Sequence, residues 1–207
     1  MGVGAQLALA AAGGYLLGSV SFALLMARLH GVDLAMVGSG NPGATNVSRA
    51  LGVRVGVLVF LLDALKGLLA AWCALRLASE APLTVAVAAG AGAVSGHCWP
   101  FWRRFRGGKG VATLSGVMLA LDPLALLLAG SIWLAGLLAT RFMSVASMGL
   151  AVGLPLAVWL RDREAATAER LPLLGFALGA GLLLVWTHRG NLARLAAGTE
   201  NRLGRRA

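Results

Sequence analysis

Charged side chains are scarce in this chain. Only 13% of its 207 residues are Asp, Glu, Lys or Arg, whereas soluble domains carry about 25%. Hydrophobic residues make up 58% of the sequence, and the mean hydropathy is +0.81. Because the deficit of charge extends along the whole chain, no stretch has the composition of a separate soluble domain. We therefore expect an all-α integral membrane protein that forms a single domain over residues 1–207.

Acidic residues are fewer still, with 8 Asp and Glu against 18 Lys and Arg and a net charge of +10. In a soluble protein such an excess would suggest a nucleic-acid partner. The chain has no soluble nucleic-acid-binding module, so no such partner is expected. Lys and Arg instead mark the cytoplasmic loops of a membrane protein and attract anionic lipid headgroups, so membrane lipids are the expected partners.

Groups that bind metals or form covalent intermediates are also missing. The two cysteines, Cys73 and Cys98, belong to no C-x-x-C pair or ligand-spaced cluster, so we expect neither a metal nor a cofactor. The sequence contains no Gly-x-Ser-x-Gly nucleophile elbow. None of the three histidines is followed five residues later by Asp, which excludes a His-x4-Asp acid–base pair.

Long apolar runs are what the chain has in abundance. Seven of them, separated by short polar segments, cover 3–27, 54–78, 82–101, 111–121, 123–140, 145–160 and 171–187. If every run crosses the membrane, thirteen Lys and Arg residues share one side and four the other, with Lys66 inside a run. This is the bias of the positive-inside rule. We predict seven transmembrane helices with the N-terminus outside, the C-terminus in the cytoplasm and the 161–170 loop outside.

The fourth of these runs is short, and the first has an unusual start. A full crossing needs about 20 residues, and the 111–121 run is ended early by Asp122-Pro123 because proline disfavours a continuing helix. We expect it to be a short span; the alternatives are a re-entrant segment and one half of a broken helix. The first run lacks the basic start of a cleaved signal peptide, so we expect it to be retained.

Three polar, basic segments interrupt the runs, and the seven-helix topology places all three on the cytoplasmic face. The first extends from Gly38 to Arg49. Positive φ angles or close backbone approach are expected at Gly38, Gly40 and Gly43. Hydroxyl and amide groups that can bind a phosphate or a hydroxyl ligand come from Ser39, Asn41, Thr45 and Asn46. If a helix begins near Thr45, Arg49 lies one turn further on and can bind an anion. An ordinary capped turn is the alternative.

The second segment extends from Arg103 to Gly110. It is not a Walker A loop, because Arg103 and Gly110 stand where that motif needs Gly and Ser or Thr. Lys109 precedes the fourth run, so its cation and a helix N-terminus can bind the same anion. The arginines at 103, 104 and 106 are expected to contact lipid headgroups.

The third segment places His188 and Asn191 three residues apart, which is one turn of a helix. His188 can serve as a general base or as a hydrogen-bond donor near neutral pH. The alternative is a histidine that caps the last helix at the membrane surface. Glu200 lies in the basic tail that follows, where it either binds a ligand or pairs with Arg202 or Arg205.

One ionic pair is expected inside a membrane span. Asp63 and Lys66 lie three residues apart in the second run, so they can share one helix face. Ionisable residues at that depth are costly and are usually paired. We favour a buried pair that neutralises itself over a proton relay.

Together these segments resemble the bacterial acyl-phosphate:glycerol-3-phosphate acyltransferases, membrane enzymes that make lysophosphatidic acid. The matching pieces occur in order along nearly the whole chain. They are Gly18-Ser19, Gly38 to Asn46 with Arg49, Asp63 to Gly67, Gly96-His97, Pro100, Phe105, Gly107 to Thr113, Arg141 to Ser144, His188 to Asn191 and Gly198 to Asn201. The resemblance implies seven spans in the bacterial inner membrane, a cytoplasmic-face site, an acyl-phosphate donor and glycerol 3-phosphate as acceptor.

The resemblance also implies roles for individual residues. We expect Ser39, His188 and Asn191 to be catalytic. We expect the substrates to bind at Gly40, Asn41, Thr45, Asn46, Arg49, Gly107, Gly108, Lys109, Gly110, Thr113, Ser144 and Glu200. Because an acyl phosphate carries a good leaving group, the 1-hydroxyl of glycerol 3-phosphate can attack it directly, without an acyl-enzyme.

In that reaction Arg49 and Lys109 would hold phosphate charges, with help from the amides of the glycine loops. Ser144 and Asn191 would orient glycerol 3-phosphate, and Ser39 or the amides beside it would stabilise the oxyanion. The base is either His188 or a phosphate oxygen of the donor. A transporter or channel for a phosphorylated solute is the alternative function, because broken spans and basic helix ends occur there too. The oligomeric state stays open.

Overall fold

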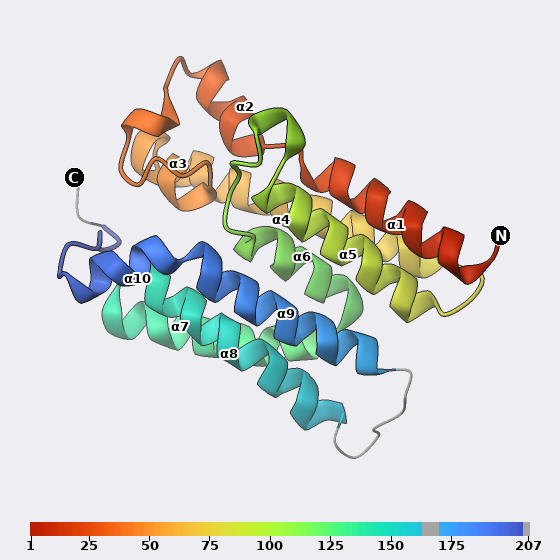
Figure 1. The fold of residues 1–207 in the computed structure, drawn as a ribbon. Coiled ribbons are helices and arrows are strands. Elements are labelled where there is room, and N and C mark those ends of the chain that lie inside the picture. Colours follow the sequence, from red (N-terminus) through yellow and green to blue (C-terminus); the bar gives the residue numbers. More distant parts are fainter. Residues whose placement is uncertain (163–169, 205–207) are drawn as a thin grey trace. The chain divides into compact units, whose positions relative to one another are not determined.

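The computed structural model describes residues 1–162 and 170–204 (Figure 1). Within these residues every regular element is a helix. The chain divides into two compact units, Met1–Ala120 and Leu121–Ala207. Part of the predicted outer loop, with Arg163, Glu164 and Glu169, lies outside the described residues, as do Arg205 and Arg206.

The first unit contains six α-helices and two single 3-10 turns. They are α1 (Val3–Gly18), α2 (Phe22–Leu29), η1 (Leu34–Met36), α3 (Ala44–Leu51), α4 (Val53–Leu77), α5 (Pro82–Cys98), η2 (Phe101–Arg103) and α6 (Val111–Leu121), which ends at the unit boundary. Figure 1 shows α2, α3 and the segment between α5 and α6 at the end of this unit away from the N-terminus.

The second unit is built from the remaining helices of the described residues. They are α7 (Pro123–Thr140), α8 (Met143–Asp162), α9 (Leu171–Thr187) and α10 (Arg189–Ala196). The helix α8 packs against both α7 and α9. The axes of α9 and α10 differ by 53° at a break next to His188.

Helix boundaries follow the apolar runs closely, with two corrections. The runs at 111–121, 123–140 and 171–187 coincide with α6, α7 and α9. The first run was expected to be one helix over 3–27, but it breaks after Gly18 and resumes at Phe22. The third run was expected to reach residue 101 and ends at Cys98, two residues before Pro100, which disfavours helix at the residue preceding it.

Four segments are long and apolar enough to cross a membrane, counting α1 and α2 as one. These are Val3–Leu29, Val53–Leu77, Pro123–Thr140 and Met143–Arg161, and the bent pair α9 and α10 makes a fifth candidate. The helix α6 is apolar but too short for this test. The architecture is therefore that of an all-helical, multi-pass membrane protein.

Glycines allow α1 and α5 to pack backbone against backbone. A Cβ atom would collide with a carbonyl oxygen of the partner helix at each of four positions: Gly14, Gly18, Gly92 and Gly96. These form a Gly-x-x-x-Gly pair on each helix, the spacing with which membrane helices approach closely. The close approach of α1 and α5 therefore depends on these four glycines.

Proline and aspartate together make the turn between α6 and α7. Pro123 is the first residue of α7, and Asp122 caps it by accepting a hydrogen bond from the amide of Ala125 at 2.9 Å. The Asp122 side chain is buried and is held by ion pairs to Arg161 and Arg170, the latter at 2.6 Å. The predicted break before Pro123 is confirmed, and the buried cap fixes its geometry.

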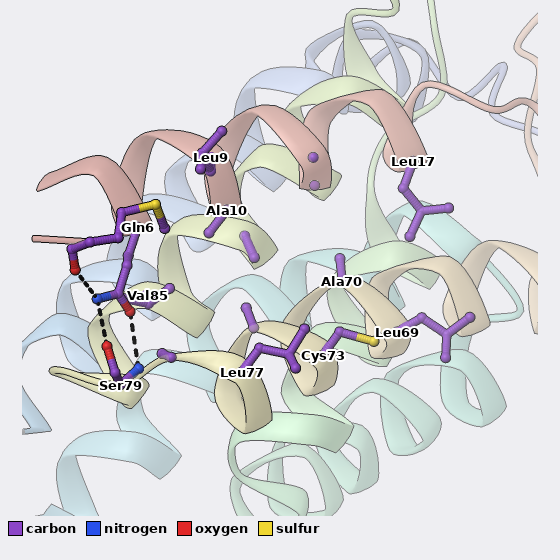
Figure 2. A pocket seen from close by; sticks show the side chains of 16 residues that line it. Gln6, Leu9, Ala10, Leu17, Leu69, Ala70, Cys73, Leu77, Ser79 and Val85 are labelled. Carbon is purple, nitrogen blue, oxygen red and sulfur yellow. Dashed lines mark hydrogen bonds between the residues drawn. The ribbon is translucent and has the colours of Figure 1, made fainter. Parts of the chain in front are cut away.

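A cavity of about 780 Å³ lies within the first unit, against α1, α4 and α5 (Figure 2). Its lining is almost entirely apolar and includes none of the residues predicted to bind substrate. Gln6 closes one end by donating to the Met1 carbonyl and to Ser79 Oγ, each at 2.9 Å, and by accepting from the Ser79 amide at 3.0 Å. This apolar space is therefore separate from the polar loops.

Candidate active site

The first polar loop leads into α3, which begins at Ala44 as the spacing of Thr45 and Arg49 required. Gly38 and Gly40 have φ angles of +54° and +67°, as expected of glycines in a tight loop. Gly43 does not: its φ of −139° is ordinary extended backbone. A Cβ atom on Gly38 would press against Asn46 and the side chain of Arg49, so the loop lies directly beside this arginine.

Asn46 is the residue that holds this loop. It is 1% exposed, its Oδ1 accepts from the Ser39 amide at 3.1 Å and its Nδ2 donates to the Leu34 carbonyl at 3.2 Å. The Gly40 amide donates to the Val37 carbonyl at 3.0 Å. The backbone amides of Ser39 and Gly40 therefore already donate to protein acceptors. The Ser39 hydroxyl is the better candidate to donate a hydrogen bond to a ligand here.

Three further polar side chains of this segment, besides Asn46 and Arg49, form no hydrogen bonds with the part of the chain that the structure describes. Ser39, Asn41 and Thr45 make no side-chain hydrogen bond to any of the described residues. An ordinary capped turn would have used them to bond local backbone. Of the four, only Asn46 does so. The loop and the first turn of α3 thus leave two hydroxyls and one amide for a ligand, groups suited to a phosphate or a polyol.

The second loop is tied to the end of α5. The amide of Gly107 donates to the Cys98 carbonyl and that of Gly108 to the His97 carbonyl, each at 3.0 Å. These two amides were expected to help bind phosphate, and their protein acceptors argue against it. Lys109 follows directly and is half-buried, two residues before α6 begins at Val111. Lys109 therefore precedes the N-terminus of a helix, as the sequence predicted.

The first turn of α6, which follows this loop, packs against the middle of α4. A Cβ atom on Gly67, near the middle of that 25-residue helix, would collide with the carbonyl oxygen of Thr113. The Thr113 hydroxyl is fully buried and has no hydrogen-bond partner among the described residues. An unpaired buried hydroxyl costs about 1–3 kcal/mol, so a ligand that bonds it would gain affinity.

In the second unit, His188 lies at the bend between α9 and α10. His188 is both the C-cap residue of α9 and the N-cap residue of α10, and it is 4% exposed. Its Nδ1 lies 2.8 Å from the Leu184 carbonyl oxygen. A carbonyl only accepts, so Nδ1 carries a proton and Nε2 is the basic nitrogen of the neutral ring. His188 thus stands at the end of α9, the position that the capping alternative gave it, and the bond to Leu184 orients a nitrogen that could act as a base.

Asn191 is positioned by Glu200. The Asn191 amide donates to Glu200 Oε1 at 2.6 Å, and Arg194 pairs with Oε2 at 2.9 Å. The Glu200 side chain is 4% exposed. The expected pairing of Glu200 with Arg202 is wrong, because Arg202 lies over the Phe142 ring instead, with 5.0 Å from its Cζ to the ring centroid. Arg205 lies outside the described residues.

Ser144 lies in the first turn of α8 and is 1% exposed. Its hydroxyl, like that of Thr113, has no hydrogen-bond partner among the described residues. The chain just before it is held by the C-terminal tail, because the Leu203 amide donates to the Arg141 carbonyl at 2.8 Å. A predicted substrate-binding hydroxyl is therefore buried, fixed in place and unsatisfied.

Asp63 and Lys66 form the expected buried pair, with 2.7 Å between Oδ1 and Nζ. The sequence did not indicate that His97 joins them, with its Nδ1 at 3.0 Å from Lys66 Nζ. A lone histidine thirty-one positions away gives no local signal of such a contact. Among residues 1–162 and 170–204, no three His, Cys, Asp or Glu side chains are grouped as a metal site requires.

The fold and these residues define a multi-pass membrane protein with basic and unsatisfied polar groups suited to a phosphorylated substrate. The family model described as "Glycerol-3-phosphate acyltransferase" matches residues 8–198. The chain belongs to this family.

Relatives with the same description are similar over almost their whole length. One from Myxococcus xanthus is 46% identical over 91% of this chain and 95% of its own. One from Halalkalibacterium halodurans is 42% identical over 94% of each. The crystal structure of PlsY (YgiH), an integral membrane glycerol 3-phosphate acyltransferase in its glycerol 3-phosphate form, is 40% identical with a TM-score of 0.87 over 96% of both chains. Its lysophosphatidic acid form is 38% identical with a TM-score of 0.85 over 96% and 95% of the two chains.

Proposed function

We propose that this protein transfers an acyl group from an acyl phosphate to the 1-hydroxyl of glycerol 3-phosphate, giving lysophosphatidic acid and phosphate. The observation that carries the proposal is the family match over residues 8–198, which includes all of the polar segments except the last few residues of the tail. Solved relatives with glycerol 3-phosphate and lysophosphatidic acid forms support the acceptor and the product. Family membership favours an enzyme over the alternative transporter.

The donor and the mechanism follow from the residues that the chain has and lacks. An acyl phosphate is an activated mixed anhydride, so positioning and charge stabilisation are enough for direct attack by the acceptor hydroxyl. The sequence has no nucleophile elbow to form an acyl-enzyme. In this proposal the hydroxyl oxygen bonds to the acyl carbon, the acyl–phosphate bond breaks, and phosphate leaves with the electron pair.

Individual side chains receive the following roles. Arg49 and Lys109 bind phosphate oxygens through charge-assisted hydrogen bonds. Ser39 donates its hydroxyl to the oxyanion. Ser144 and Asn191 orient glycerol 3-phosphate, and the proton of its attacking hydroxyl passes to His188 Nε2 or to a phosphate oxygen of the donor.

Three residues that were predicted to bind ligand are better explained as residues that hold other parts of the protein in position. Asn46 uses both ends of its amide to hold the Ser39 loop. Glu200 holds Asn191, and Gly108 is bonded to the end of α5. Each would affect the reaction through the residue it positions.

The proposed setting is the bacterial inner membrane, with seven spans and the polar loops on the cytoplasmic side. The helix α6, with 11 residues, would cover about 16 Å of the bilayer at 1.5 Å per residue. Its start beside the middle of α4 supports a short span that begins within the membrane. The excess of Lys and Arg on one side of the seven-span arrangement supports the orientation.

Purified protein in detergent, with radiolabelled glycerol 3-phosphate and either palmitoyl phosphate or palmitoyl thioesters, tests the proposal. Labelled lysophosphatidic acid from palmitoyl phosphate alone is the expected result. Product from the thioesters alone would overturn the proposed acyl-phosphate donor but would still support glycerol 3-phosphate as the acceptor. No product from folded protein, together with uptake of unmodified glycerol 3-phosphate into vesicles, would establish the transporter instead.

A further inference from the structure

A buried ionic cluster lies halfway along α4, and the proposed mechanism gives it no role. Lys66 and Asp63 are each 2% exposed and His97 is 9% exposed. Lys66 Nζ lies 2.7 Å from Asp63 Oδ1 and 3.0 Å from His97 Nδ1. It also donates to the Val20 carbonyl oxygen at 2.7 Å. One ion pair and two hydrogen-bond contacts therefore surround this buried amino group.

The Lys66 ammonium therefore joins three separate parts of the first unit. Val20 lies in the break between α1 and α2, and its carbonyl has no partner within a continuous helix there. Asp63 lies on α4 itself and His97 in the last turn of α5. Buried ion pairs are often no more stabilising than apolar packing of the same volume. A cluster of this kind is better explained by the geometry that it imposes than by stability.

His97 extends the cluster to the glycine loop. Its carbonyl accepts the Gly108 amide at 3.0 Å, and a Cβ atom on Gly108 would collide with Nε2 of its ring. Nδ1 of the His97 ring faces the ion pair, at 3.0 Å from Lys66 Nζ and 3.6 Å from Asp63 Oδ1, so the opposite ring edge, with Nε2, lies at Gly108. Both the backbone and the ring of His97 thus lie against the residue that precedes Lys109.

We propose that Lys66, held by Asp63, acts through His97 as a positioning centre that fixes the Gly107–Gly110 loop, and with it Lys109, for the substrate phosphate. The proposal rests on the proposed function and assigns no substrate contact to Asp63, Lys66 or His97. A shift of about 1 Å at a reacting group can cost on the order of 100-fold in rate. A small displacement of this loop is therefore measurable as activity.

His97→Asn separates positioning from folding. The Asn side chain can replace Nδ1 as the partner of Lys66, so the buried charge keeps a partner, whereas the ring edge at Gly108 is lost. We expect a variant with a native elution profile in detergent and a melting temperature near that of the native protein. Its kcat/KM for glycerol 3-phosphate, per folded protein, should fall tenfold or more. A native value of kcat/KM in this variant would overturn the proposal.

Gln6→Leu is the matched control, because Gln6 also links two parts of the first unit by buried polar contacts but lies at the other end of α1. A merely structural loss of such a link should change stability and leave kcat/KM per folded protein unchanged. A drop in kcat/KM for Gln6→Leu equal to that for His97→Asn would show a general packing effect and would also overturn the proposal.

A double-mutant cycle tests the contact itself. Gly108→Ala places a methyl group against the His97 ring and should also lower kcat/KM. Because the shorter Asn side chain leaves room for that methyl, the double variant should keep more activity than the product of the two single effects predicts. Simply multiplicative effects would argue against the contact. Absence of acyl transfer by the native protein would instead reject the proposed function, before any variant is compared.

Discussion

Lys109 is the side chain on which the proposed chemistry depends most directly. Lys109→Ala should lower kcat/KM by roughly 100- to 1000-fold, the usual effect of removing one group that stabilises charge in the transition state. The fold should persist, because the residue is half-buried and lies outside the helices. Acyl transfer from palmitoyl phosphate measures the effect, with elution in detergent as the check on folding.

Arg106→Ala is the matched control for that variant, since Arg106 is an exposed cation of the same loop. We expect its turnover to stay within about twofold of the native protein, because exposed surface charges contribute little on their own. Near-native turnover in Lys109→Ala would refute the phosphate-binding role of Lys109.

Glu200 gives a second test, because its role depends on Asn191. Glu200→Ala removes the acceptor that holds the Asn191 amide at 2.6 Å, so Asn191 should lose its orientation. We expect a fall in kcat/KM of about tenfold. Combined with Asn191→Ala, the two effects should be far from additive in free energy, because residues that act as one unit couple. Independent effects in the cycle would mean that Glu200 acts on substrate by another route.

Close packing of α1 on α5 is a property of these two elements, and adjacent glycines test it. A methyl group on Gly14 would collide with the Ala89 carbonyl oxygen, whereas one on Gly13 meets nothing within 4 Å. Gly14→Ala should therefore lower the free energy of unfolding by about 1–3 kcal/mol. Gly13→Ala should leave it unchanged or raise it by up to about 1 kcal/mol. Thermal unfolding in one detergent compares the two, and equal melting temperatures would contradict the packing argument.

The membrane topology belongs to the whole molecule. With both native cysteines replaced by Ala, single cysteines at Glu80, Arg106 and Arg189 report on three segments outside the predicted spans. Seven spans predict that a membrane-impermeant maleimide labels Glu80→Cys on intact cells and the other two variants only after permeabilisation. Labelling of Arg189→Cys from outside would mean that the 111–121 segment does not cross.

Most helices could be predicted because their cause is local. A membrane segment must satisfy its backbone hydrogen bonds within itself, so an apolar run bounded by glycine, proline or charge is enough to place α6, α7 and α9 within their residue ranges. The break after Gly18 had no such signal. Within that break the Val20 carbonyl accepts a hydrogen bond from Lys66, which lies forty-six positions further along the chain.

The polar segments were recognised from residue types, because phosphate ligands need cations, small residues and hydroxyls wherever they bind. The sequence alone therefore determined the membrane class, most helix ranges and the candidate residues. The spatial arrangement decided which of them bind protein instead, because Asn46 holds its loop and Glu200 holds Asn191. It also brought His97, which was not among the candidates, to Asp63 and Lys66. Each of these contacts joins different elements, so its geometry depends on packing that no local pattern encodes.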